Sequence, residues 1–377
     1  MPREITSSKQ VALLATGDEI IQGDIQNTNS QQIAVRLTNQ NIQIGMHMST
    51  GDNIDTIMHA MEFLLASHKG LIITGGLGPT SDDLTRFALS KLINHPLIFD
   101  HSIWEYICQR LKRFGYPTPP ESNRQQALFP EGATIIPNPN GTAAGCWLQF
   151  NDKYIFMLPG PPDECLSMID SVVLPTLLKN NYQQILYREK WLLFGASEGK
   201  IAEELDKIAK PFNCITGYRL CYPYLEFKLL SSDQQALAEL IPLIEEAIKP
   251  HLIGNGKQTA SEQIKPLLEK MNGRLGICDL ATGGLLESII TTPATTSHVL
   301  FSKQGSDFQA MNYIEISGLE EFWQDKKDAS KTQLKLVTHI ENKTQTTETV
   351  MPLRGDRVKL YAVEWVCQQM INHKIIG

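Results

Sequence analysis

Two short segments near the start of the chain gather the residue types that phosphate and metal chemistry needs. The first is Thr16-Gly17-Asp18-Glu19, and the second runs from Thr74 to Asp83 as Thr-Gly-Gly-Leu-Gly-Pro-Thr-Ser-Asp-Asp. Glycines let backbone N–H groups approach a phosphate closely. Carboxylates beside such a loop would repel the phosphate unless a cation lay between them. The two segments therefore predict an Mg²⁺-like ion that bridges carboxylates and phosphate oxygens.

The carboxylates of Asp18, Asp82 and Asp83 are the predicted metal ligands, and one of them could orient an attacking water. A second interpretation stays open for Asp82 and Asp83, because acids are common at the N-cap and in the first turn of a helix. The same two segments, and the residues that follow the first, offer further candidate binding groups. These are Gly17, Glu19, Asn27, Asn29, Gly75, Gly76, Gly78 and Thr80.

Short strands and helices must position these loops. Residues 11–16 and 71–74 are apolar runs that end in glycine turns, which is typical of buried strands. A helix is expected over 82–93, with its free N–H groups and positive dipole end near the loop. Asp52 and Asn53 are both candidate N-caps for a helix that follows them. In a parallel sheet, the loops after the strand ends line the ligand crevice.

The whole pattern predicts an α/β protein of three domains. Strands and helices alternate over 1–183, which favours a parallel sheet with helices on both faces. Residues 150–158 are expected to form one strand region there. A small α+β unit is expected over 184–255, and a further α/β domain over 256–377.

Composition limits the classes of partner. The net charge is −7 and the pI about 5.8, which disfavours non-specific nucleic-acid binding. No apolar run reaches the roughly 18 residues of a membrane span. The seven cysteines are scattered without a C-x-x-C pair, and the segment from Met1 to Lys9 lacks the apolar core of a signal peptide. We therefore expect a cytoplasmic protein that binds neither nucleic acid nor membrane.

Five motifs in order resemble the molybdopterin-binding (MoaB/MogA-like) domain in the form found in the CinA family of competence- and damage-inducible proteins. Beside the two segments above, they are Asn-Arg-Gln-Gln-Ala at 123–127, Asn-Pro-Asn-Gly-Thr-Ala-Ala-Gly at 138–145 and Leu-Pro-Gly-Pro-Pro-Asp-Glu at 158–164. The resemblance implies a hydrolase that cleaves ADP-ribose-like dinucleotides to AMP and ribose 5-phosphate. It also implies a divalent metal: Mg²⁺, Mn²⁺, Co²⁺ or Ni²⁺.

The resemblance also implies roles for individual residues. Gly75, Gly76, Gly78 and Thr80 would cradle the pyrophosphate. Arg124 would neutralise phosphate charge, unless it only pairs with an acid at the surface. A pterin-nucleotide site is the alternative within the same fold. The rest of the nucleotide pocket would comprise Asn138, Gly141, Thr142, Gly160 and Glu164.

Residues 184–255 resemble the KH-type domain of the same family. RNA-binding KH modules clamp the backbone with a GXXG loop, whereas Gly195-Ala196-Ser197-Glu198-Gly199 has a different spacing. We therefore expect a spacer or dimer element here, in a homodimer.

Residues 256–377 resemble the family's nicotinamide mononucleotide deamidase domain, whose motif is Ala-Glu-Ser-Cys-Thr-Gly-Gly with Ser as the nucleophile. Leu280 stands at the Ser position, and leucine can neither attack an amide nor transfer a proton. We predict that deamidase activity is lost, although Thr282, Ser288 or Ser297 could in principle substitute. A non-enzymatic nucleotide- or pterin-binding assembly protein is the rival to the enzyme. The degenerate motif comprises Asp279, Leu280, Thr282, Gly283 and Gly284.

Overall fold

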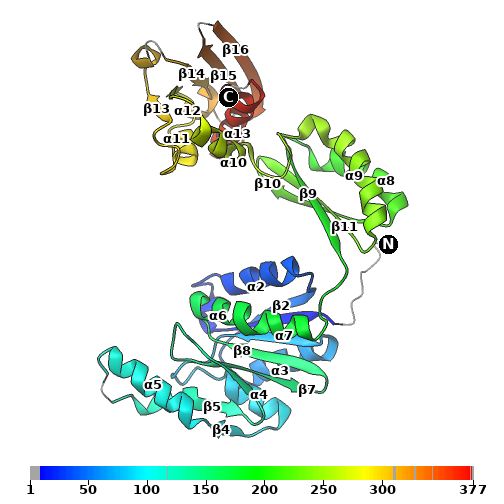
Figure 1. Cartoon of the computed structure of the whole chain (residues 1–377), viewed down its shortest axis with the longest axis vertical. Coiled ribbons are helices and arrows are strands. Elements are labelled where there is room, and N and C mark those ends of the chain that lie inside the picture. Colours follow the sequence, from blue (N-terminus) through cyan, green and yellow to red (C-terminus); the bar gives the residue numbers. More distant parts are fainter. Residues whose placement is uncertain are drawn as a thin grey trace. The chain divides into compact units, whose positions relative to one another are not determined.

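The computed structural model confirms the α/β class and shows two compact units, residues 3–185 and 186–377 (Figure 1). Each unit is described by itself. The described residues are 9–116, 118–308, 311–326, 328–341, 343–373 and 375.

The first unit is built on a six-stranded sheet in the order β2-β1-β3-β8-β7-β6. The strands from β2 to β8 are parallel, whereas β7 and β6 are antiparallel, so the sheet is mixed rather than wholly parallel. The strand expected over 150–158 is confirmed as β8, but it begins at Lys153, and Phe150 ends the preceding strand β7. Asn151 and Asp152 both have positive φ and close a β7–β8 hairpin, a conformation that Asn and Asp tolerate. The strands are β1 (Val11–Thr16), β2 (Ile44–Thr50), β3 (Gly70–Thr74), β6 (Thr134–Ile136), β7 (Gly145–Phe150) and β8 (Lys153–Leu158).

Helices cover both faces of this sheet, as expected (Figure 1). On one face, Ile33 and Leu37 of α2 (Thr28–Asn39) pack with Val11 and with α6 (Pro162–Met168) and α7 (Leu174–Lys179). On the other face lie α3 (Ile54–Ser67) and α4 (Thr85–Ile93). The remaining elements are α1 (Asp18–Gln22), β4 (Leu97–Phe99), α5 (His101–Arg113), η1 (Glu121–Ala127), β5 (Leu128–Pro130) and η2 (Ile169–Val173).

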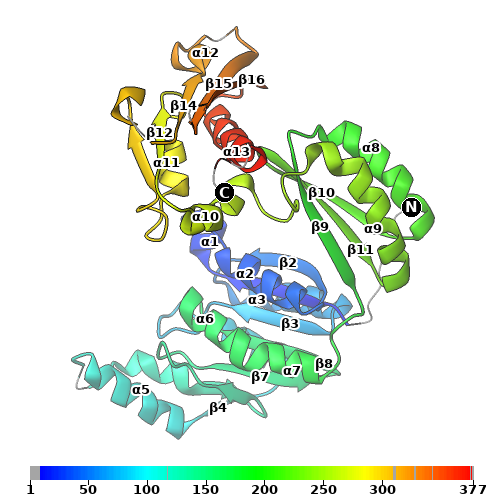
Figure 2. The ribbon, with the colours of Figure 1, turned by 45° about the horizontal axis from the view of Figure 1, so that its top comes forward.

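The second unit begins with a three-stranded antiparallel sheet, β10-β11-β9, with α8 and α9 on one face (Figure 2). Trp191 and Phe227 stack in its core, beside Leu240 of α9. β10 was not anticipated, because Ile-Thr-Gly-Tyr-Arg-Leu-Cys shows no clean alternation. The elements are β9 (Tyr187–Phe194), α8 (Glu198–Ala209), η3 (Lys210–Phe212), β10 (Ile215–Cys221), β11 (Tyr224–Ser231), α9 (Gln234–Ile248) and η4 (Lys249–His251).

A five-stranded mixed sheet, β13-β12-β14-β15-β16, follows in the same unit. Leu334 and Leu336 of β15 are buried beneath α13, and β14 and α12 precede β15 in the chain. The elements are α10 (Ala260–Lys270), β12 (Leu275–Asp279), α11 (Leu285–Ile290), β13 (Val299–Ser302), η5 (Gly305–Phe308), β14 (Tyr313–Gly318), α12 (Glu320–Trp323), β15 (Lys331–Ile340), β16 (Lys343–Pro352) and α13 (Arg357–Asn372).

The two sheets of the second unit share buried residues. Phe194 and Tyr224, from the three-stranded sheet, belong to the hydrophobic core formed by α10 and α13. The division of this unit at 255 therefore stays a prediction. None of the described helices combines the length and apolar character that a membrane span requires.

Candidate functional site

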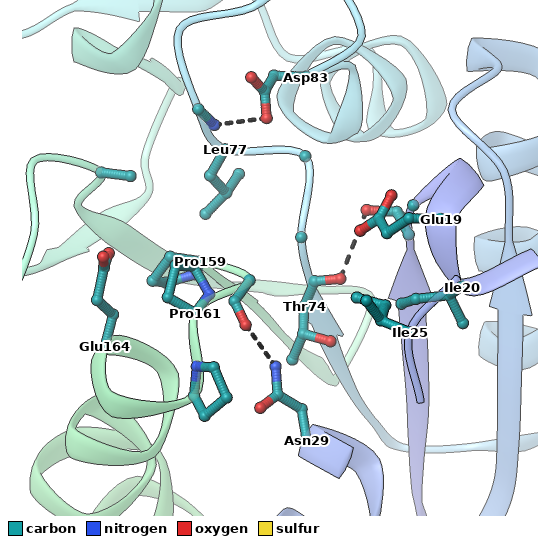
Figure 3. A pocket seen from close by; sticks show the side chains of 18 of the residues that line it. Glu19, Ile20, Ile25, Asn29, Thr74, Leu77, Asp83, Pro159, Pro161 and Glu164 are labelled. Atoms are coloured by element: carbon teal, nitrogen blue, oxygen red, sulfur yellow. Dashed lines mark hydrogen bonds between the residues drawn. The ribbon is translucent and has the colours of Figure 1, made fainter. Parts of the chain in front are cut away.

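A pocket of about 520 Å³ opens at the carboxyl ends of β1, β3 and β8, where a crevice was predicted. Glu19, Ile20 and Ile25 lie on one side of it, and Pro159, Pro161 and Glu164 lie opposite (Figure 3). Its volume is in the range of small-molecule sites. The predicted site residues that line it are Gly17, Glu19, Asn27, Asn29, Gly75, Gly76, Gly78, Asp82, Asp83, Thr142, Gly160 and Glu164.

The glycine-rich loop is tied closely to the strand ends beneath it. Gly75 and Gly76 have φ of 100° and 64°, which side chains rarely adopt. A Cβ on Gly76 would also collide with the Thr85 hydroxyl. That hydroxyl donates to the Gly75 carbonyl at 2.9 Å and lies 3.1 Å from the hydroxyl of Thr16. Glycine is therefore required at both positions by this turn.

Asp83 closes the loop from inside. Its carboxylate accepts hydrogen bonds from Gly78 N at 2.7 Å, Thr80 N at 2.8 Å and the Thr80 hydroxyl at 2.5 Å. The helix that follows begins at Thr85 instead of near Asp82, so neither acid caps it or lies in its first turn. The carboxylate of Asp83 thus holds the loop together and also lines the pocket, and its role as a metal ligand stays a prediction.

Three of the four backbone N–H groups in the predicted pyrophosphate cradle already have acceptors within the protein. Gly75 N donates to the Leu158 carbonyl, while the N–H groups of Gly78 and Thr80 donate to Asp83. Thr80 does not line the pocket. Among these four residues, Gly76 alone has a backbone N–H without an acceptor in the described part of the chain.

Carboxylates from two neighbouring strand ends meet beside the pocket. Asp18 N donates to Asp52 Oδ2 at 2.9 Å, and Asp52 N donates to Asp18 Oδ1 at 3.0 Å. Burial raises the pKa of Asp52, and the negative charges of Asp18, Glu19 and Asp82 raise it further, against a backbone hydrogen bond from Asp18 that lowers it. Like charges are thus gathered here, and no cationic side chain among the described residues pairs with them.

Within the described residues, no three His, Cys, Asp or Glu side chains are arranged to hold a metal ion by themselves. Mg²⁺ is commonly held by one or two carboxylates together with substrate phosphates. The acids near Asp52 suit that arrangement better than a closed protein cage. Asp82 is exposed and lines the pocket, whereas Asp18 does not line it.

The far wall of the pocket is a hydrogen-bonded frame. Asn29 Nδ2 donates to the Gly160 carbonyl at 2.6 Å, and Asn29 Oδ1 is buried without a partner in the described residues. Asn138 donates to Glu164 at 2.6 Å and accepts from Gly141 N, so it supports the wall from behind. Asn138 and Gly141 lie outside the pocket lining, which corrects their assignment as direct ligand contacts.

Two other assignments change. Arg124 lies outside the pocket lining, 3.2 Å from Glu121, with its guanidinium over the rings of Phe99 and Trp104. This corresponds to the surface-pair alternative, because those contacts hold the side chain away from the site. Asn27 lines the pocket, but its side chain accepts from Ser30 N as the N-cap of α2.

Sequence reasoning missed Asp52 as a site residue. It noted Asp52 only as a candidate cap, whereas the cap of α3 is Asn53, which accepts from Asp55 N and Thr56 N. A helix needs one N-cap, so the second capping-type residue beside Asn53 was the available signal that Asp52 has another role. The apolar lining residues Ile20, Ile25 and Leu77 were also missed, since isolated apolar residues in loops, or in a helix as short as α1, carry no periodicity.

The degenerate motif of the second unit forms a closed turn. Asp279 accepts from Ala281 N, Thr282 N and the Thr282 hydroxyl, which in turn accepts from Leu286 N. Thr282 is fully buried, so its hydroxyl serves the turn. The Ser288 hydroxyl likewise donates within its own helix, to the Leu285 carbonyl.

Comparisons with known proteins show the family to which the chain is similar. Residues 12–179 match the family described as "Probable molybdopterin binding domain". A "CinA-like protein" of Geobacter metallireducens is 31% identical over 78% of this chain and 73% of its own length. A "Putative competence-damage inducible protein" of Alkaliphilus metalliredigens is 35% identical over 74% of this chain and 69% of its own. A solved CinA structure from Thermoplasma acidophilum, described as of unknown function, is 28% identical over 46% of this chain and 98% of its own, with a TM-score of 0.41.

Proposed function

Because the chain belongs to the CinA-like protein family and carries its molybdopterin-binding domain, we propose that its first unit is a metal-dependent hydrolase of ADP-ribose-like dinucleotides. The products would be AMP and ribose 5-phosphate. The observation that carries the proposal is the pocket itself, with the glycine-rich loop meeting the carboxylates of Glu19, Asp52 and Asp82.

The chemistry of the lining supports a charged, two-ended ligand. The free N–H of Gly76 suits a phosphate oxygen, and the unpartnered Asn29 Oδ1 suits a ribose hydroxyl. Apolar groups of Ile20, Ile25 and Pro161 offer a surface for a base. A divalent cation held by Asp82, with Asp52 near it, would neutralise phosphate charge when bound. One of the carboxylates would orient the attacking water.

The test is incubation of the purified chain with ADP-ribose and, separately, Mg²⁺, Mn²⁺, Co²⁺ or Ni²⁺. We expect equimolar AMP and ribose 5-phosphate with at least one metal and none with chelator. No AMP with any metal would favour the non-enzymatic nucleotide-binding alternative.

Pterin binding is the second candidate, favoured by the family description of residues 12–179. The carboxylate of Glu164 lines the pocket and could accept from the N–H groups of a pterin ring. Competition between a pterin monophosphate and ADP-ribose for the pocket, measured by calorimetry, separates the two candidates.

A further inference from the structure

We propose that Asp83 and Arg86 are positioning residues that fix the orientation of a single peptide group, Leu77–Gly78, and so give the loop its anion-binding shape. The inference deepens the proposed function and rests on it only for the consequence on turnover. Both side chains come from the segment just after the loop, at the entry to α4.

The two residues hold opposite ends of the same peptide plane. Arg86 Nη2 donates to the Leu77 carbonyl at 2.5 Å, and Gly78 N donates to Asp83 Oδ1 at 2.7 Å. A peptide group is planar, with its C=O and N–H pointing in opposite directions. Contacts at both ends therefore oppose rotation of this plane.

Four further carbonyl oxygens of the loop also accept hydrogen bonds. Those of Gly75 and Gly76 accept from the hydroxyl and N–H of Thr85. Those of Gly78 and Thr80 accept from Gln125 Nε2 at 3.0 and 2.7 Å. Carbonyl oxygens repel a phosphate, so holding them on protein donors favours an anion. Release of the Leu77–Gly78 plane would free one carbonyl to turn toward the ligand.

Arg86 is a buried cation whose position destabilises the fold, and its contact with the loop explains why it is there. The residue has no exposed surface, and its Nε and Nη1 have no partner in the described residues. Burial lowers the pKa of Arg86 to about 10, against the opposing effects of Cys146 and Asp83. A buried cation with unused donors destabilises the fold compared with an apolar side chain of similar volume. Its hydrogen bond to the Leu77 carbonyl is a role that an apolar side chain could not fill.

The test compares Asp83→Asn, Arg86→Met and Arg86→Lys in the full chain. Lys91→Met is the matched control, because Lys91 is an exposed cation on the same helix that pairs only with Asp55 among the contacts of the described residues. We expect amide exchange of Gly78 and Thr80 to accelerate about tenfold or more in Asp83→Asn and Arg86→Met. Arg86→Lys, which keeps a cationic donor, should lie closer to wild type, and Lys91→Met should equal it.

Turnover separates positioning from metal binding. With ADP-ribose, Asp83→Asn and Arg86→Met should raise KM about tenfold and leave the metal concentration for half-maximal rate unchanged. Asp82→Asn should shift that metal concentration instead. Unchanged amide exchange of Gly78 and Thr80 in both Asp83→Asn and Arg86→Met would overturn the inference. So would a changed metal concentration for half-maximal rate in Asp83→Asn while Arg86→Met behaves as the wild type. If the wild type releases no AMP, the proposed function fails but this inference does not. Amide exchange of Gly78 and Thr80 still tests whether Asp83 and Arg86 hold the Leu77–Gly78 peptide group.

Discussion

At the scale of single residues, the two acids that end the glycine-rich segment do different work. Asp83 is held by three donors inside the loop, whereas Asp82 is exposed at the pocket. The nearby Thr80 side chain and its own backbone N–H lower the pKa of Asp82, so this carboxylate is charged at neutral pH. An exposed, charged carboxylate at the pocket is available to a cation.

We expect Asp82→Asn to lower AMP release at least about 100-fold, because an amide lacks the charge that a hard cation requires. The melting temperature should stay near that of the wild type, since the side chain is exposed. Steady-state kinetics over a range of metal concentrations, with circular dichroism as the folding control, measures both. Near-normal turnover with an unchanged metal requirement would remove Asp82 from the site.

Asp52 should affect stability in a pH-dependent direction. Burial and the acidic neighbours raise the pKa of Asp52 in the folded chain. As the pH rises through 3.8, the ordinary value for Asp, the folded state therefore binds more protons than the unfolded state. Stability therefore falls over that window and stays lower at neutral pH. Asp52→Asn should stabilise the chain near pH 7 by less than about 1 kcal/mol, because the site is partly solvated, and should match the wild type near about pH 3.

Thermal melts at the two pH values measure this difference. Saturating Mg²⁺ should raise the wild-type melting temperature more than that of Asp52→Asn, since a cation relieves the same repulsion. Equal melting temperatures at both pH values would show that the acids do not repel one another.

At the scale of elements, sequence patterns predicted those parts whose signal is local. Asn53 and the apolar spacing after it correctly predicted α3, and the apolar runs predicted β1 and β3. β16 was missed because Lys343–Pro352 is mostly exposed and carries no apolar alternation, so its formation depends on pairing with β15. The loops of the site were found from their glycines and acids.

The meeting of Asp18 with Asp52 could not be predicted in that way. It follows from parallel pairing of β1 with β2, which aligns Thr16 with Thr50 and places each acid two residues beyond its strand end. Strand order is a tertiary property that depends on packing across the sheet. The same limit applies to Arg86, whose burial under the loop carries no sequence signal.

A buried carboxylate joins elements of the second unit. Glu364 of α13 accepts from the Tyr224 hydroxyl at 2.6 Å, and from the backbone N–H and hydroxyl of Ser261 at 3.1 and 2.6 Å. Tyr224 in turn accepts from Ala260 N at the start of α10. The network thus links β11, α10 and α13.

Glu364→Ala should destabilise the second unit by about 3–5 kcal/mol, because three buried donors lose their acceptor. Glu364→Gln, which keeps an acceptor oxygen and the volume, should cost less. Urea unfolding followed by tryptophan fluorescence measures both, with the exposed Glu246→Gln as control. A midpoint for Glu364→Ala equal to that of the control would mean that water satisfies the released donors.

At the scale of the whole molecule, the two units differ in what they offer chemistry. The first unit presents a pocket lined by several carboxylates and by Gly76, whose N–H has no acceptor among the described residues. In the second unit, the polar groups of the degenerate motif hydrogen-bond to one another within the turn. Trp323 lies over this turn, donating Nε1–H to the Ala281 carbonyl at 2.9 Å, and a Cβ on Gly283 would meet its ring at 2.8 Å. Leu280 is 55% exposed beside it.

We therefore expect no ammonia release from nicotinamide mononucleotide by the wild type, and none from Leu280→Ser. A nucleophile needs a base beside it and donors around the developing oxyanion, and these parts act as a unit. The buried Thr282 hydroxyl already bonds Asp279, and the Ala281 carbonyl, an acceptor, is engaged by Trp323. Adding Trp323→Ala to Leu280→Ser opens the turn without supplying a base, so the double variant should stay inactive as well. Ammonia release by the wild type would identify another nucleophile. Ammonia release by Leu280→Ser or by the double variant, but not by the wild type, would mean that the base and oxyanion donors survive elsewhere in the unit.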